Sequence, residues 1–253
     1  MAIARGNNSK ATGLSGQSTC TWAHTVPSTA NALLVVGVEQ VGNTLTATAT
    51  YNGNAMTELQ SINMSSGGRK VHLFYIVIAN PDGNAHNIVV TLSAAHTSYY
   101  WLLTAADYSD AQQGAPHKNS STTEDYPNSS PISASVTTTD DNCWLISVTG
   151  GTKTLSAGTN TSYVIGNDTA SPSDSDSLVI LDSNGAKTPA GTYSLQATWT
   201  GDQAEAMILI AIAPYASITG PAHIASINGV ASANILSRNG VALGNIKSIN
   251  GVE

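Results

Sequence analysis

The feature that most constrains the fold of this chain is a series of short strand-like segments, with no convincing helical stripe among them. Three segments alternate apolar and polar residues, as a strand with one buried face does: residues 44–51, 71–79 and 192–199. Six others are short continuous apolar runs, which suit central strands of packed sheets: residues 32–38, 88–92, 101–106, 144–148, 178–181 and 207–213. Turn pairs such as Asn52-Gly53 and Asn184-Gly185 separate them. The pattern predicts an all-β chain of antiparallel strands.

The composition favours the same fold class. Charged residues make up only 10% of the chain, against roughly 25% in ordinary globular proteins. Few long charged side chains means few good helix formers, whereas Thr, Val, Ile and Tyr favour a pleated surface. A chain of 253 residues can bury a full core without disulfides or metals. We therefore predict an antiparallel β-sandwich, jelly-roll-like, over residues 1–215, followed by a short repetitive β tail.

Two parts of the sandwich region resemble each other in outline. Residues 29–35 and 139–145 each lead into an apolar strand, and each part ends in an apolar strand running into a tyrosine, Tyr108 or Tyr215. This similarity has two possible explanations: the region consists of two similar halves, or the similarity is a coincidence. Residues 112–131 are rich in Ser, Thr, Asn and Pro and lack apolar periodicity. We predict that they form a long loop joining the two halves.

The C-terminal segment, residues 216–253, repeats one motif three times at a spacing of 11 residues. Each copy is Ile-x-Ser-x-Asn-Gly-Val, and its Asn-Gly pair suits a tight type I′ turn, so each copy is predicted to be a small strand-turn-strand unit. One unit buries too little to stand alone, so copies must stack on one another, on the main domain, or on the tails of neighbouring chains. We favour neighbouring chains in a homo-oligomer, with a trimer as the simplest geometry, because three units still leave open edges. The residues predicted to dock or oligomerise are Ile224, Ile227, Asn228, Gly229, Val230, Ile235, Asn239, Gly240, Val241, Ile246, Ile249, Asn250, Gly251 and Val252.

Charge and hydropathy exclude several classes of partner. The net charge is −7 with only 9 Lys and Arg, which argues against nucleic acid binding. No stretch approaches the ~20 apolar residues of a membrane span, so we expect no membrane insertion. Residues 1–10 lack the apolar core of a secretory signal, which fits a virion component released by lysis or a chain whose signal has been removed. Cys20 and Cys143 either pair across a sandwich or stay as buried thiols, and the sequence does not decide between these states.

The sequence contains no nucleophile elbow, phosphate loop or zinc-ligand spacing. We therefore predict no catalytic residue and no metal-histidine site, and we expect a protein that is not an enzyme. His72 shares a strand face with Phe74, Ile76 and Ile78, as a core or interfacial histidine does. Two acidic groups could flank loops that hold Ca²⁺ or, as dispersed paired acids, serve a glycan-cleaving enzyme, although solvated loop acids are the simpler interpretation. These acids are Asp107, Asp110, Glu124, Asp125, Asp168, Asp174, Asp176 and Asp182.

Three consecutive aromatic residues are the candidate ligand site. Tyr99, Tyr100 and Trp101 alternate between the two faces of a strand, so at least one ring is expected at the surface, where it would stack on a sugar. The alternative is that Trp101 and Trp199 anchor the core while the tyrosines lie at the rim.

Several of these segments resemble a known module. Residues 31–38, 51–57 and 73–77 are similar to a β-sandwich module of tailed-bacteriophage virion proteins and bacterial surface proteins, over most of residues 1–215. The Ile-x-Ser-Ile-Asn-Gly-Val tail likewise resembles C-terminal repeats of phage structural and tail-associated proteins. The resemblance implies a non-enzymatic protein on the virion surface, as a head decoration, fibre or tail-associated protein beside other virion proteins. The alternative is a carbohydrate-binding adhesin that grips a host cell-surface glycan. The resemblance transfers no site residues.

Overall fold

The computed structural model describes residues 2–42, 44–64, 68–95, 100–128, 130–168, 176–200 and 203–215, and four pairs of residues at 226–227, 230–231, 237–238 and 241–242. The chain divides into two compact units, Ala2–Tyr215 and Ala216–Glu253, the latter grouped with Met1. All regular structure in the described residues is β-strand. The described residues contain no helix long and apolar enough to span a membrane.

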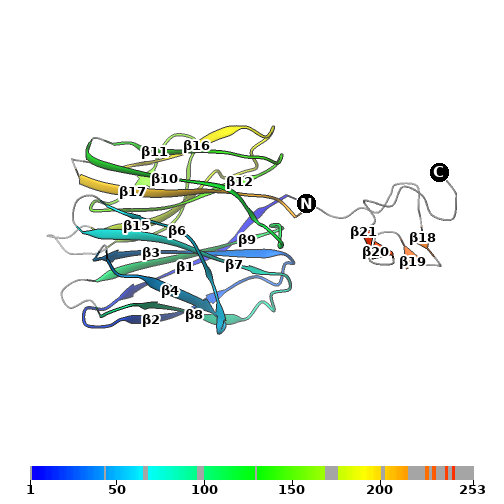
Figure 1. Cartoon of the computed structure of the whole chain (residues 1–253), viewed down its shortest axis with the longest axis horizontal. Helices are drawn as coiled ribbons and strands as arrows, with labels where there is room; N and C mark the ends of the chain where they lie inside the picture. The colour runs from blue at the N-terminus through cyan, green and yellow to red at the C-terminus, as the bar shows by residue number, and fades with distance from the viewer. Residues whose placement is uncertain are drawn as a thin grey trace. The chain divides into compact units, whose positions relative to one another are not determined.

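The first half of the larger unit is a sandwich of two antiparallel sheets (Figure 1). One sheet has five strands in the order β1-β9-β3-β7-β6, and the other has four in the order β2-β8-β4-β5. The strands are β1 (Ala4–Gly13), β2 (Thr19–Thr25), β3 (Ala32–Val41), β4 (Ala47–Tyr51), β5 (Asn54–Ala55), β6 (Thr57–Asn63), β7 (Arg69–Ile78), β8 (Ala85–Leu92) and β9 (Trp101–Ser109). The first strand pairs with the last, and the second with the last but one, which is the order of a jelly roll.

The second half repeats this strand order, except that β5 has no counterpart among its described residues. Its five-stranded sheet has the order β10-β17-β12-β15-β14 and its three-stranded sheet the order β11-β16-β13. The strands are β10 (His117–Asn128), β11 (Ile132–Thr137), β12 (Trp144–Gly151), β13 (Ser156–Ala157), β14 (Ser162–Asp168), β15 (Ser177–Asp182), β16 (Thr192–Thr198) and β17 (Gln203–Ile212). The turns that precede β3 and β12 are also alike, because Asn31 and Asn142 both have a positive φ, 59° and 62°. The segments 29–35 and 139–145 thus lead into corresponding strands, β3 and β12.

The two sandwiches pack through their five-stranded sheets, which gives four layers in all (Figure 1). Between these sheets lies a shared core, in which Leu33 and Leu73 of the first sandwich pack with Ile146 and Ile208 of the second. Each sandwich also has its own core between its two sheets. The central strands are therefore covered on both faces, as their continuous apolar sequences predict.

Glycines let the two central sheets approach closely. A Cβ at Gly37 of β3 would lie 2.7 Å from Val148 Cγ1 of β12, and a Cβ at Gly150 of β12 would lie 2.6 Å from Val71 Cγ2 of β7. Real Cβ atoms do not come so close to other carbons, because interiors are already close-packed. The interface thus has glycine on both sides.

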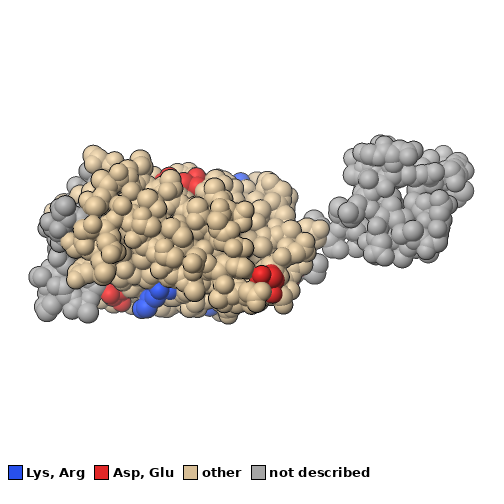
Figure 2. Space-filling view, turned by 90° about the horizontal axis from the view of Figure 1, so that it is seen from below, with Lys and Arg blue, Asp and Glu red and all other residues tan. Residues whose placement is uncertain are grey.

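The outer sheet of the first sandwich presents an uncharged, hydroxyl-rich face. Thr19, Thr91 and Thr48 stand side by side across β2, β8 and β4, all exposed. The hydroxyls of Thr19 and Thr91 are 3.3 Å apart. Figure 2 views this side of the molecule and shows only scattered charged side chains.

Three expectations from the sequence are corrected. Residues 112–131 are not one long loop, because 117–128 form β10, which pairs along β17. The apolar run 88–92 lies in an outer sheet and alternates, with Thr91 exposed. The segment 71–79 is not half-buried along its length, because β7 is buried on both faces from Val71 to Phe74.

The two cysteines do not pair. Both are free thiols, and they belong to different sandwiches, Cys20 on β2 and Cys143 just before β12. Burial raises the pKa of both thiols, so they are weak nucleophiles.

Candidate functional site

The predicted aromatic platform is not formed as a set. Trp101 is 1% exposed and belongs to the core of the first sandwich, with its ring over Gly13 of β1. Its ring is therefore a core anchor and is closed to a ligand. Tyr100 is 52% exposed, and Tyr99 lies outside the described residues.

The tail contains two short hairpins. Ile227 of β18 (Ser226–Ile227) pairs with Val230 of β19 (Val230–Ala231), and Arg238 of β20 (Ser237–Arg238) pairs with Val241 of β21 (Val241–Ala242). Two positions separate the paired residues in each hairpin, which is the loop length that Asn-Gly favours. The remaining predicted docking residues, including the whole third repeat, lie outside the described residues. Docking and oligomerisation remain predictions.

A hydrogen-bonded chain joins half-buried Ser9 to buried His24 and Asp107 at one edge of the first sandwich. His24 Nδ1 lies 2.8 Å from Ser9 Oγ, and His24 Nε2 lies 3.1 Å from Asp107 Oδ2. Asp107 Oδ2 also accepts the backbone N–H of Asn7 at 2.9 Å. Gly6 makes room for this carboxylate, since a Cβ there would lie 1.9 Å from Asp107 Oδ1.

These are the residue types of a hydrolase triad, but their geometry is that of a structural clamp. In a serine hydrolase the Nε2 atom of the histidine faces the serine and Nδ1 faces the aspartate, whereas His24 has the opposite orientation. The Ser9 hydroxyl is also held by Trp22, whose Nε1–H donates to it at 3.0 Å. The chain of bonds ties β1 to β2 and closes the edge between the two sheets.

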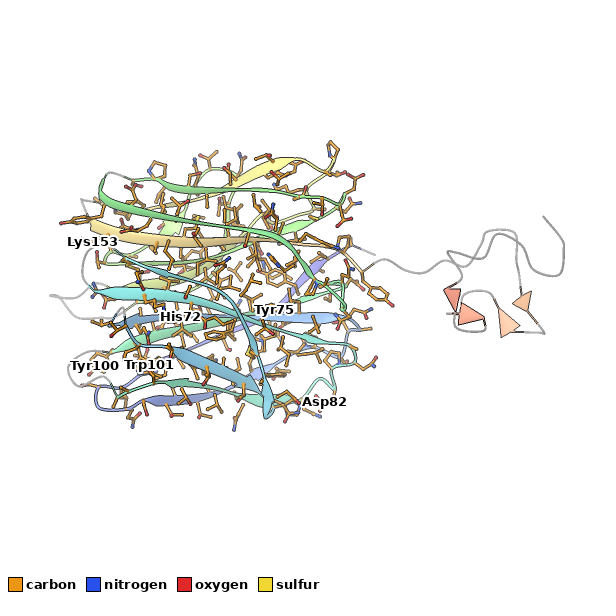
Figure 3. The ribbon with its side chains drawn as sticks, viewed as in Figure 1. His72, Tyr75, Asp82, Tyr100, Trp101 and Lys153 are labelled. Carbon is orange, nitrogen blue, oxygen red and sulfur yellow. The ribbon has the colours of Figure 1, made fainter. Side chains whose placement is uncertain are left out.

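A surface cavity lies at the end of the first sandwich opposite Tyr100, as the positions of Asp82 and Tyr100 in Figure 3 show. We call it the Asp82 cavity. It has a volume of about 370 Å³. Its lining consists of Tyr51, Asn52, Asn54, Ile76, Val77, Ile78, Asn80, Pro81, Asp82 and His86. These residues come from the β4–β5 turn, the end of β7, the β7–β8 loop and the start of β8.

The polar groups of this cavity are held in place by local bonds. Asp82 Oδ1 accepts the backbone N–H of Asn84 at 2.9 Å, and both carboxylate oxygens lie 3.0 Å from His86 Nε2. The hydrogen bonds from Asn84 and the nearby His86 lower the pKa of Asp82 to about 2, so the group is a carboxylate at neutral pH. The rings of His86 and Tyr51 meet edge to face at 5.8 Å.

A second, shallower depression occupies the equivalent place in the second sandwich. We call it the Tyr163 depression. It is lined by Asn160, Thr161, Ser162, Tyr163, Ser183, Asn184 and Lys187. Its residues come from the β13–β14 loop, the start of β14 and the β15–β16 loop, the counterparts of the segments around Asp82. It has no aliphatic floor and carries a lysine, so its chemistry differs.

The histidine and acidic groups are mostly structural. His72 is buried, as predicted, and its Nδ1 lies 2.8 Å from Glu58 Oε1 while its ring stacks on Phe74 at 6.0 Å. Burial lowers the pKa of His72.

Asp107 and Asp182 lie in strands rather than loops, and both are buried. Asp174 lies outside the described residues. Among the described residues, no three His, Cys, Asp or Glu side chains are grouped so that they could hold a metal ion.

Buried charges lie between the two sandwiches. Arg69 forms an ion pair with Asp176, and its Nε lies 3.6 Å from Glu39 Oε1. Burial, reinforced by Asp176, raises the pKa of Glu39 well above its ordinary value. Near the same end of the central strands, Glu205 of β17 faces Asp125 of β10. Burial, together with the charge of Asp125, raises the pKa of Glu205 to about 8.

Comparison of the sequence with protein-family models and with curated proteins found no match. The sequence predicts the turn at Asn52-Gly53, but only the jelly-roll topology brings this turn beside the β7–β8 loop around one cavity. Ser9 was missed because β1 carries no apolar alternation.

Proposed function

We propose that this protein is a non-enzymatic structural protein of a bacteriophage virion, displayed on the particle surface as a head decoration, fibre or tail-associated protein. The observation that carries the proposal is the repeated hairpin of the tail, whose units are too small to be stable alone. Pairing with the same tail of other chains, most simply in a trimer, or with other virion proteins would complete them. Jelly-roll sandwiches occur in viral capsid proteins and in lectins, which supports the proposal by analogy of fold alone.

The body of the protein suits display. Its two sandwiches share one core, which makes a thick and rigid unit. The outer threonine face is uncharged, and a chain with a net charge of −7 is expected to stay soluble at a particle surface.

The test is the location of the protein in purified particles. Phage particles are purified by density gradient after lysis of the source cells and labelled with gold-linked antibody raised against residues 2–215. We expect gold at regular positions on the particle surface. Protein that stays at the top of the gradient, with unlabelled particles below, contradicts the proposal.

A carbohydrate-binding adhesin is the second candidate, and it is compatible with the first. The Asp82 cavity favours it, because this cavity combines aliphatic side chains with amides and a carboxylate. A glycan array probed with the full chain in the presence of Ca²⁺ tests it. Specific hits support the adhesin role, and an array without hits contradicts it.

A further inference from the structure

The Asp82 cavity has the size and form of a small-ligand site. Pockets for small molecules generally span about 300–1,000 Å³, and this one has about 370 Å³. It is open to solvent through the exposed side chains of Asn52, Asn54, Asn80 and Asp82. It can therefore admit a ligand without movement of the strands.

Its lining has an apolar part and a polar part. Ile76 and Ile78, both half-buried, and the ring of Tyr51 provide carbon surface. The Tyr51 hydroxyl donates to the carbonyl oxygen of His24 at 3.3 Å and so fixes the ring. Amide side chains offer both donors and acceptors, and a carboxylate offers acceptors only. A sugar ring presents the complementary pattern, with C–H groups on its faces and hydroxyls around its rim.

The polar part is ordered before any ligand arrives. Asp82 is held by Asn84 and His86, and the Asn54 side chain donates to the carbonyl oxygen of Asn52 at 3.2 Å. Groups that are already ordered lose little conformational freedom on binding, so more of the contact energy appears as affinity.

Charge decides between classes of sugar. The lining includes the Asp82 carboxylate and no lysine or arginine. An acidic sugar would place its own carboxylate near Asp82, where the lining offers no lysine or arginine to compensate and His86 is already bonded to Asp82. Such like charges cost binding energy. A neutral sugar meets no such penalty, and its hydroxyls can donate to Asp82.

We propose that the Asp82 cavity binds a single neutral sugar ring, with a C–H face against Ile76 and Ile78 and hydroxyls bonded to Asp82 and neighbouring amides. This inference rests on the second proposed function, the adhesin, and assigns it a site other than the one expected from Tyr99, Tyr100 and Trp101.

The experiment is saturation-transfer NMR on the full chain with the methyl glycosides of glucose, galactose, mannose and N-acetylglucosamine. Sialic acid serves as the acidic probe. We expect transfer to at least one neutral glycoside and none to sialic acid.

Two variants test the site: Asn80→Trp, which fills the cavity from an exposed loop position, and Asp82→Asn, which keeps the shape and removes the charge. We expect Asn80→Trp to abolish binding, because the indole occupies the ligand's place. We expect Asp82→Asn to lower affinity about tenfold, since a hydrogen bond to a charged group contributes about that factor.

Tyr163→Ala is the matched control, because Tyr163 is 44% exposed and lines the equivalent depression of the second sandwich. It should bind as the native chain does. If a neutral glycoside binds and only Tyr163→Ala loses it, the inferred site is wrong while the adhesin role stands. If no neutral glycoside binds, or sialic acid binds better, the inference is overturned. The virion proposal is tested separately by particle labelling and does not depend on this result.

Discussion

Asp182 connects the two sandwiches through its carboxylate. Its oxygens accept Arg5 Nε–H at 2.8 Å, the Tyr108 hydroxyl at 3.2 Å and the backbone N–H of Asn184 at 2.8 Å. Arg5 and Tyr108 belong to the first sandwich and Asp182 to the second. Asp182 and Tyr108 are fully buried, whereas the Arg5 side chain is 26% exposed. Removal of the Asp182 carboxylate therefore leaves the Tyr108 hydroxyl without its acceptor in the core and Arg5 without its ion-pair partner.

Asp182→Ala should therefore destabilise the protein by about 3 kcal/mol, as breaking other buried ion pairs does. Urea unfolding followed by circular dichroism measures the change. Lys118→Ala is the control, because it removes the surface pair of Lys118 with Asp140, whose atoms are 3.5 Å apart, and should cost less than about 1 kcal/mol. Equal losses in both variants would contradict the role given to Asp182.

Glu205 should make stability depend on pH. Neither of its carboxylate oxygens accepts a hydrogen bond from a described residue, and its pKa rises from 4.5 to about 8 on folding. The folded protein thus holds this proton more tightly than the unfolded chain. The stabilisation is complete below about pH 4.5 and is lost as pH rises through about 8.

Comparison of the native chain with Glu205→Gln isolates this effect. Between pH 5 and 9 the native chain should lose more unfolding free energy than the variant, with an upper limit of about 5 kcal/mol for this shift. Urea midpoints at each pH provide the measurement. Parallel profiles for the two chains would show that Glu205 is not protonated in the folded state.

For a single residue, the alternation of a strand predicts the face it occupies but not whether that face is covered. Alternation placed His72 on the same face as Phe74 correctly, because period 2 fixes the side of a strand. The same rule could not say which of Tyr100 and Trp101 is covered, since that depends on Gly13 of a strand some ninety positions away. Burial is a property of the partner strand as much as of the residue.

At the scale of elements, the central strands are the best predicted and the first strand of each sandwich the least. Strands β3, β12, β15 and β17 are covered on both faces, so each reads as a continuous apolar run. Strand β10 forms an edge, and its described side chains, residues 117–126, are all exposed or half-exposed and all polar except Tyr126. Such a strand is held by backbone bonds to β17, which leave no hydrophobic pattern in the sequence.

The close approach of β3 and β12 makes a prediction for Gly37. Gly37→Val should overpack the shared core against Val148 and cost roughly 1–3 kcal/mol. Gly114→Val is the control, because a Cβ at Gly114 has no atom within 4 Å and needs no unusual φ. Thermal unfolding compares the two. If Gly37→Val matches its control, the sheets are not packed as closely as described.

At the scale of the whole molecule, the shared core should make the two sandwiches one folding unit. Residues 2–111 alone would expose the apolar face of β3, β7 and β9 that the second sandwich covers. We expect this fragment to aggregate or unfold, and residues 2–215 to unfold in a single transition by calorimetry and circular dichroism. Two separate transitions, or a soluble and cooperatively folded fragment, would contradict a shared core.

The most direct test of the account is the oligomeric mass of the full chain beside a chain that ends at Tyr215, measured by light scattering. The tail repeats are proposed to pair between chains. We therefore expect a trimer, near three times 25.9 kDa, for the full chain and a monomer for the shortened one. Monomers in both cases would show that the tail does not assemble copies of this protein, and would contradict the proposed assembly.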